Sequence, residues 1–128
     1  LVDMPGYGFA SAPKARIASW TSLIHDFLLG RATLARVYVL IDARHGIKDI
    51  DKTVLGTLDR SAVSYQVVLT KADEVKAAEM AERIDATRTQ LASHPAAFPD
   101  VLVTSSRTCD GIPELRAAMA RLIGEHRR

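Results

Sequence analysis

Cysteine, net charge and long apolar runs are all scarce in this sequence. Cys109 is the single cysteine of the 128 residues, which excludes an internal disulfide and a cysteine metal cluster and predicts a small apolar filler instead. A formal charge of +2 is too small to indicate a nucleic-acid partner. No apolar run is long enough to cross a bilayer, and no secretory leader is present. We therefore expect a cytoplasmic protein without a membrane contact.

The residues that are present alternate between two patterns along the chain. Continuous apolar runs predict strands over residues 37–41, 65–69 and 101–103, the first of them covered on both faces. Apolar residues at three- and four-residue steps predict helices over residues 14–29 and 49–60, a third helix soon after Asp73 and a terminal helix from Ile112. The alternation predicts one α/β domain in three layers, with a parallel sheet between helices. In such a sheet, ligands bind at the carboxyl ends of the strands.

The first ten residues, LVDMPGYGFA, indicate the end of a buried strand that runs into a glycine-interrupted loop. Asp3 closes the strand, Pro5 removes a hydrogen-bond donor, and Gly6 and Gly8 let the backbone approach a ligand closely. A carboxylate at a strand end can hold a hydrated Mg²⁺, while the Gly6 N–H faces a terminal phosphoryl oxygen. The alternative is an ordinary turn in which Asp3 bonds its own loop.

A second polar segment, Thr70-Lys71-Ala72-Asp73, follows the next candidate strand. The Asp73 carboxylate can accept two parallel hydrogen bonds from guanine, a donor pair that adenine lacks, so one aspartate can set the choice of base. Lys71 can lie along the base, and Thr70 can tie this loop to its neighbour. The alternative is that Asp73 caps the helix after it and that Lys71 is solvated.

The segment Thr104-Ser105-Ser106 follows the last predicted strand. Its small side chains let a backbone N–H, that of Ser106, point at guanine O6, although such residues taken alone are more typical of a simple turn. Asp42 also ends a predicted strand, and we expect its carboxylate either to cap the strand or to bond loop amides. A phosphate-facing loop followed by two guanine-facing loops, each after a buried strand, favours one bound guanine nucleotide.

With these segments in place, the chain resembles the EngB-type (YihA/YsxC) GTPases, which assist assembly of the large ribosomal subunit in bacteria. VDMPGYGFA is similar to the family's DxPGYG(F/Y)A segment, LIDARHG and LTKADEV resemble its next two blocks, and TSSRTCDGIPEL resembles its closing block. The resemblance covers residues 1–128 and implies the carboxyl-terminal two-thirds of an α/β domain of the P-loop GTPase type, truncated at its amino end. It also implies GTP or GDP as ligand, Mg²⁺, a ribosomal partner, a link to cell division and septation, and a monomer.

The resemblance also implies roles by position. Asp3 becomes the Mg²⁺-side carboxylate and Gly6 the sensor of the terminal phosphate. The guanine-recognition residues become Thr70, Lys71 and Asp73, supported by Thr104, Ser105 and Ser106. Tyr7 stands where many small GTPases carry the glutamine that orients the attacking water. A phenol is a poor substitute at this catalytic position, so the hypothesis is slow intrinsic hydrolysis that a partner or K⁺ accelerates.

One departure from the family pattern is large. The phosphate-binding segment GxxxxGK[ST] and the first switch are absent from residues 1–128. Those segments supply a backbone N–H cradle, a lysine and a direct metal ligand. We therefore expect a piece of a longer protein that binds GTP weakly or not at all on its own, whereas the complete protein binds and hydrolyses GTP. The rival from another class is a nucleotide-free α/β module that contacts ribosomal RNA or protein.

Overall fold

The computed structural model describes Ser22 and residues 36–126. The expected helix over residues 14–29 and the loop that contains Asp3, Gly6 and Tyr7 lie outside the described residues. The elements that it describes are β1 (Val37–Asp42), α2 (Asp49–Arg60), β2 (Tyr65–Thr70), the short 3-10 helix η1 (Ala72–Glu74), α3 (Ala77–Leu91), β3 (Leu102–Val103) and α4 (Ile112–His126). The predicted alternation of strands and helices is confirmed over this part of the chain.

The strands form one parallel sheet in the order β1-β2-β3. Asp42 pairs with Thr70 at the ends of β1 and β2, and Leu69 pairs with Val103 at the end of β3. Parallel strands place their carboxyl ends at one edge of the sheet. The segments that follow all three strands therefore meet at the same edge, as the sequence predicts.

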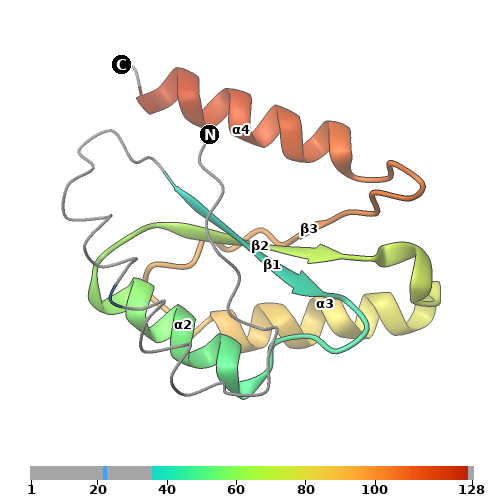
Figure 1. Ribbon diagram of the computed structural model, residues 1–128, viewed down its shortest axis with the longest axis horizontal. Coiled ribbons are helices and arrows are strands. Elements are labelled where there is room, and N and C mark those ends of the chain that lie inside the picture. The colour runs from blue at the N-terminus through green and yellow to red at the C-terminus, as the bar shows by residue number, and fades with distance from the viewer. Residues whose placement is uncertain (1–21, 23–35, 127–128) are drawn as a thin grey trace.

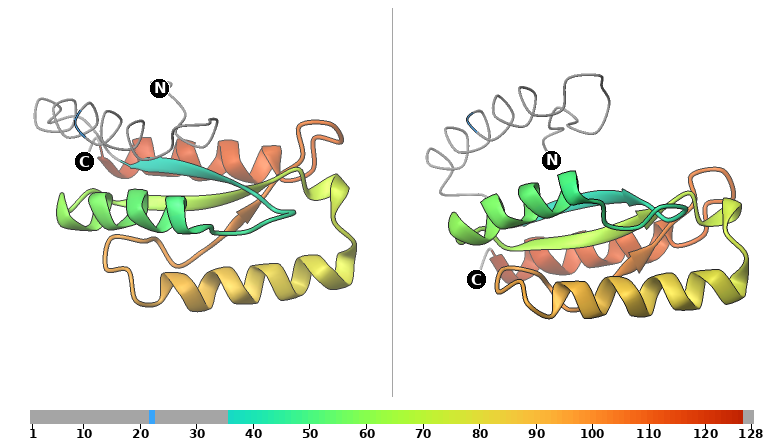
Figure 2. Two further views of the ribbon diagram at one scale, coloured as in Figure 1. Left: turned by 60° about the horizontal axis from the view of Figure 1, so that its bottom comes forward. Right: turned by 90° about the horizontal axis from the view of Figure 1, so that it is seen from below.

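Helices cover both faces of this sheet. Helices α2 and α3 lie on one face and α4 lies on the other (Figures 1 and 2). A hydrophobic core lies between the sheet and helices α2 and α3, where Val54, Leu55 and Leu58 form the buried stripe of α2. The strand residues in this core are Val39, Ile41, Tyr65, Val67 and Leu69. The predicted three-layer α/β fold is confirmed.

The other face of β1 is less covered than its sequence predicts. Successive strand residues point to opposite faces, so Leu40 faces away from the core that buries Val39 and Ile41. Leu40 is 63% exposed, and the expectation that both faces of this strand are covered is wrong at this residue. A continuous apolar run shows that both faces are apolar, but it does not by itself determine how far each side chain is covered.

One further expectation changes in the structure. Cys109 is exposed and has a left-handed backbone with φ of 65°, so its predicted role as an apolar filler is wrong. It belongs to the turn between β3 and α4, in which residues 106–110 are all exposed. The third helix begins at Ala77, within a few residues of Asp73 as predicted, and the short helix η1 precedes it directly after β2. Within residues 36–126, no helix has the length and apolarity that a membrane crossing requires.

Candidate functional site

Asp73 and Ser105 bring the loops after β2 and β3 together. Asp73 lies exposed in η1, and the buried Ser105 hydroxyl donates to its Oδ1 at 2.6 Å. The same hydroxyl oxygen accepts the N–H of Thr108 at 3.2 Å, so Ser105 is itself fixed by its loop. A carboxylate offers about four acceptor positions, and Asp73 therefore keeps acceptor capacity for a ligand. Lys76 occupies the N-cap position of α3, so the alternative in which Asp73 caps that helix is wrong.

Backbone hydrogen bonds fasten these two loops to each other. The Thr104 N–H donates to the Leu69 carbonyl at 2.8 Å, and the Ala72 N–H donates to the Thr104 carbonyl at 3.1 Å. Thr104 is buried in this junction, whereas Ser106 is exposed beside it. The structure thus brings Thr104, Ser105 and Asp73 together, and their contact with a nucleotide stays a prediction.

Thr70 and Lys71 form the turn between β2 and η1. The Thr70 hydroxyl donates to the Ile41 carbonyl at 3.4 Å, which ties this loop to β1 as the sequence predicts. Lys71 has a left-handed backbone with φ of 58° and ψ of 37°. A side chain other than glycine costs about 1–2 kcal/mol in this region, so the neighbouring contacts must stabilise the turn. The conformation aims Lys71 toward the end of β1, where its Nζ lies 3.6 Å from Asp42 Oδ2.

Asp42 has the most strongly perturbed pKa among the described acids at this edge. Its Oδ1 accepts the Arg44 N–H at 2.9 Å, and its Oδ2 accepts Arg44 Nη2 at 2.7 Å. The hydrogen bonds from the Arg44 guanidinium hold the pKa of Asp42 well below its usual range, against the opposing effect of burial, and the charge of Lys71 adds to the lowering. Asp42 is therefore ionised at neutral pH. The expectation that it bonds loop amides is confirmed.

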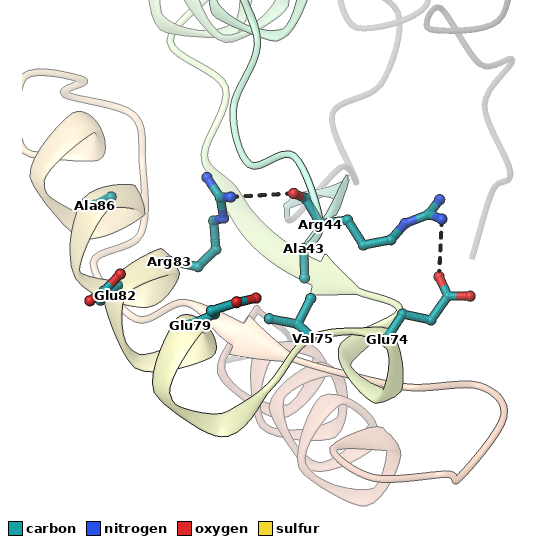
Figure 3. A pocket seen from close by; sticks show the side chains of 8 residues that line it. All are labelled: Ala43, Arg44, Glu74, Val75, Glu79, Glu82, Arg83 and Ala86. Atoms are coloured by element: carbon teal, nitrogen blue, oxygen red, sulfur yellow. Dashed lines mark hydrogen bonds and ion pairs between the residues drawn. The ribbon is translucent and has the colours of Figure 1, made fainter.

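An open groove of 360 Å³ lies beside the Asp73 loop rather than on it. Its lining includes Arg44, Glu74, Val75 and Arg83, and neither Lys71 nor Asp73 belongs to it. Arg44 Nη1 lies 3.2 Å from Glu74 Oε2 across one end of the groove (Figure 3). The groove therefore marks the seam between the loop after β1 and helix α3.

The structure adds residues that the sequence analysis did not place in the site. Gly111 has φ of 76°, and a Cβ there would lie 1.8 Å from the Val103 carbonyl oxygen. This glycine lets the chain pass close to β3 and return the Ser105 loop toward α4. In the sequence, Gly111 is a single glycine before the last helix. Such a glycine is common at helix boundaries and does not by itself indicate a close approach to β3. Arg44 stands two residues after its partner Asp42 on the same turn, so local reasoning could have found this pair.

The phosphate side of the site cannot be built from the described residues. Asp3, Gly6 and Tyr7 lie outside them. Across residues 36–126, no group of three or more histidine, cysteine or acidic side chains is gathered to hold a metal ion. The assignment of the implied Mg²⁺ to Asp3 stays a prediction.

Comparison with known proteins gives a consistent result. No protein-family model matches the chain. The chain is 94% identical over all of its 128 residues to a probable GTP-binding protein EngB of Nitrobacter winogradskyi, and 75% identical over 127 residues to one of Rhodopseudomonas palustris. The matches cover 100% and 99% of this chain but 59% of each relative, so the chain spans well under two-thirds of their length.

Solved structures with the same fold are more distant in sequence. Apo elongation factor SelB of Methanococcus maripaludis superimposes with a TM-score of 0.73 at 21% identity, over 97% of this chain and 25% of that one. The same factor in complex with the GTP analogue GppNHp gives a TM-score of 0.63 at 22% identity, over 81% of this chain and 23% of that one. The likeness to SelB concerns the fold alone. From the identities with the two bacterial relatives, the chain belongs to the EngB family.

Proposed function

We propose that this chain forms the base-binding part of a GTPase that binds GTP and GDP through guanine. The observation that carries the proposal is the exposed Asp73 carboxylate, anchored by the buried Ser105 hydroxyl at the carboxyl edge of the sheet. A fixed carboxylate can accept the paired N–H donors of guanine, and it faces an unfavourable contact with adenine, which lacks them. The names of the relatives support the proposal, because those proteins are described as GTP-binding.

The chemistry of the complete protein would divide between two ends of the nucleotide. In this proposal Thr70, Lys71, Asp73 and the Ser105-Ser106 loop hold the base, and Gly6 and Tyr7 lie at the terminal phosphate. Mg²⁺, with Asp3 on its side of the site, would neutralise phosphate charge during hydrolysis of GTP to GDP. Because Tyr7 is a poor group for orienting water, hydrolysis would be slow until a partner or K⁺ accelerates it.

The proposed setting follows from the family resemblance. The complete protein would act as a cytoplasmic monomer, assist assembly of the large ribosomal subunit and be linked to septation. Residues 1–128 contain no GxxxxGK[ST] segment, so these residues alone are expected to bind GTP weakly.

Titration calorimetry of the complete protein with GDP and ADP tests this proposal. We expect micromolar or tighter binding of GDP and at least about a hundredfold weaker binding of ADP, because Asp73 would lose both of its donors. Equal affinities would contradict guanine recognition. Absence of binding to either nucleotide would favour the rival, a nucleotide-free module that contacts ribosomal RNA or protein.

A further inference from the structure

Asp42 links the end of β1 to the proposed base-binding loop. Because Asp42 pairs with Thr70 in the parallel register, its carboxylate lies beside Lys71, the residue that follows β2. Its Oδ2 lies 3.6 Å from the Nζ of Lys71, and the Lys71 side chain is 55% exposed. We propose that Asp42 is a positioning residue for nucleotide binding, because it holds the Lys71 ammonium in place before the base arrives. This inference rests on the proposed function of the same site.

The length of the ion pair suits this role. A separation of 3.6 Å is an ionic contact rather than a tight hydrogen bond, so Lys71 is attracted to Asp42 without being locked against it. Lysine is among the side chains that lose most rotamer freedom when they become ordered. A carboxylate that confines Lys71 in the free protein reduces the ordering that the nucleotide would otherwise have to impose.

Asp42 can hold Lys71 because Asp42 is itself held. Arg44 donates to its carboxylate from Nε and Nη2. The Nη1 of the same guanidinium lies 3.2 Å from Glu74 Oε2. Within residues 36–126, two carboxylates contact Arg44, and of these Asp42 also reaches Lys71. A carboxylate with a fixed orientation therefore lies next to a lysine with a flexible side chain. The fixed partner can restrict the positions that the ammonium group of the flexible one adopts.

Helix α3 fixes the loop that directly follows this carboxylate. Arg83 donates from Nη1 to the His45 carbonyl and from Nη2 to the Arg44 carbonyl, both at 3.3 Å, and Figure 3 shows it reaching across the groove. Gly46 makes room for this arginine, since a Cβ there would lie 2.7 Å from Arg83 Nη1. The loop after β1 is thus clamped to α3, and Asp42 transmits that fixed position to Lys71.

A double-mutant cycle on the complete protein separates this role from a merely structural one. The dissociation constant for a fluorescent GDP analogue is measured for the wild type, Asp42→Asn, Lys71→Met and the double variant. We expect each single substitution to weaken binding by about five- to twentyfold, and Asp42→Asn to cause no further loss once Lys71 is absent. An equal loss in both backgrounds would overturn the inference, because Asp42 would then act without Lys71. An unchanged dissociation constant for Asp42→Asn would also overturn it.

The controls address folding and the proposed function separately. In Asp42→Asn, the side-chain oxygen can still accept the Arg44 N–H. If the Tm of this variant falls by more than about 5 °C, Asp42→Ser, which preserves the same type of turn, is used in its place. Asp49→Asn removes an exposed carboxylate that pairs with Lys52 at 3.7 Å on α2, and it should leave GDP binding unchanged. A wild-type protein that binds no GDP would refute the proposed function itself. Binding by the wild type with an additive cycle would refute only the role of Asp42.

Discussion

The Ser105 hydroxyl donates to Asp73 Oδ1 at 2.6 Å, across 32 positions of the sequence. This hydrogen bond joins the loop after β3 to the loop after β2 and fixes the direction of one carboxylate. Ser105 is buried while Asp73 is exposed, so the donor belongs to the scaffold and the acceptor faces outward. The pair turns two strand ends into one candidate base-binding surface.

Ser105→Ala should weaken binding of GDP by the complete protein about tenfold. A hydrogen bond to a charged group contributes about 1.5–3 kcal/mol, and here its loss frees Asp73 to leave the geometry that guanine requires. Ser106→Ala is the matched control, because the proposed contact of Ser106 uses its backbone N–H and survives the substitution. Calorimetry with GDP measures both variants. Equal effects of the two substitutions would argue against an anchoring role for Ser105.

Gly111→Ala should lower the free energy of unfolding by about 3 kcal/mol or more. The new methyl group meets the Val103 carbonyl oxygen at 1.8 Å, and φ of 76° disfavours any side chain other than hydrogen. Gly124→Ala is the control, because nothing lies within 4 Å of its added Cβ in α4. That substitution should stabilise the protein by about 0.5 kcal/mol through helix propensity. Urea denaturation of the complete protein compares them, and a tolerated Gly111→Ala would contradict the close approach.

Asp59 ties α2 to the connector before β3 at the opposite end of β2. Its Oδ2 contacts His94 Nδ1 at 2.5 Å, and its Oδ1 accepts the Ala96 N–H at 3.1 Å. Asp59→Ala removes both contacts and leaves the Ala96 N–H without its acceptor, so we expect a loss of about 1–3 kcal/mol in the free energy of unfolding. Asp85→Ala, on the exposed side of α3, should change it by less than about 0.5 kcal/mol. Comparable losses for both variants would exclude a specific tie at Asp59.

Asp42 should make the stability of the protein depend on pH in the acid range. Its pKa is lowered in the folded state by the hydrogen bonds from Arg44, so its contribution is fully present above the unfolded pKa of about 4. The contribution is lost as the pH falls from there through the depressed folded pKa. The difference in free energy of unfolding between wild type and Asp42→Asn should therefore be constant from about pH 5 to 8 and shrink below about pH 4. A difference that grows toward acid pH would contradict the pairing with Arg44.

Periodicity predicted the fold well because the core depends on it. The apolar steps of Val54, Leu55 and Leu58 gave the range of α2, and the runs around Val39 and Val67 gave β1 and β2. Leu40 shows the limit of this reasoning. An apolar side chain favours burial, but its identity alone does not determine how much of its surface is covered. The short helix η1 was missed because three residues carry too little periodic signal.

The candidate site was predicted as a set of loops but not as a set of contacts. Asp73 was chosen for its chemistry, whereas the Ser105 hydroxyl that holds it depends on how β2 and β3 pair. The bond between Arg44 and Asp42 was within reach of local reasoning, but the contact of Asp42 with Lys71 follows only from the register of β1 and β2. Long-range contacts of this kind require the topology first.

The most direct test of guanine recognition is the base preference of an Asp73→Asn variant of the complete protein. Asparagine can still accept the Ser105 hydroxyl, but it presents an amide donor where guanine needs an acceptor, and that donor suits the C2 carbonyl of xanthine. We predict that the affinity of the variant for GDP falls by about a hundredfold or more. Its affinity for xanthosine diphosphate should rise until it exceeds its affinity for GDP. An unchanged affinity for GDP, with no gain for xanthosine diphosphate, would show that Asp73 does not read the base.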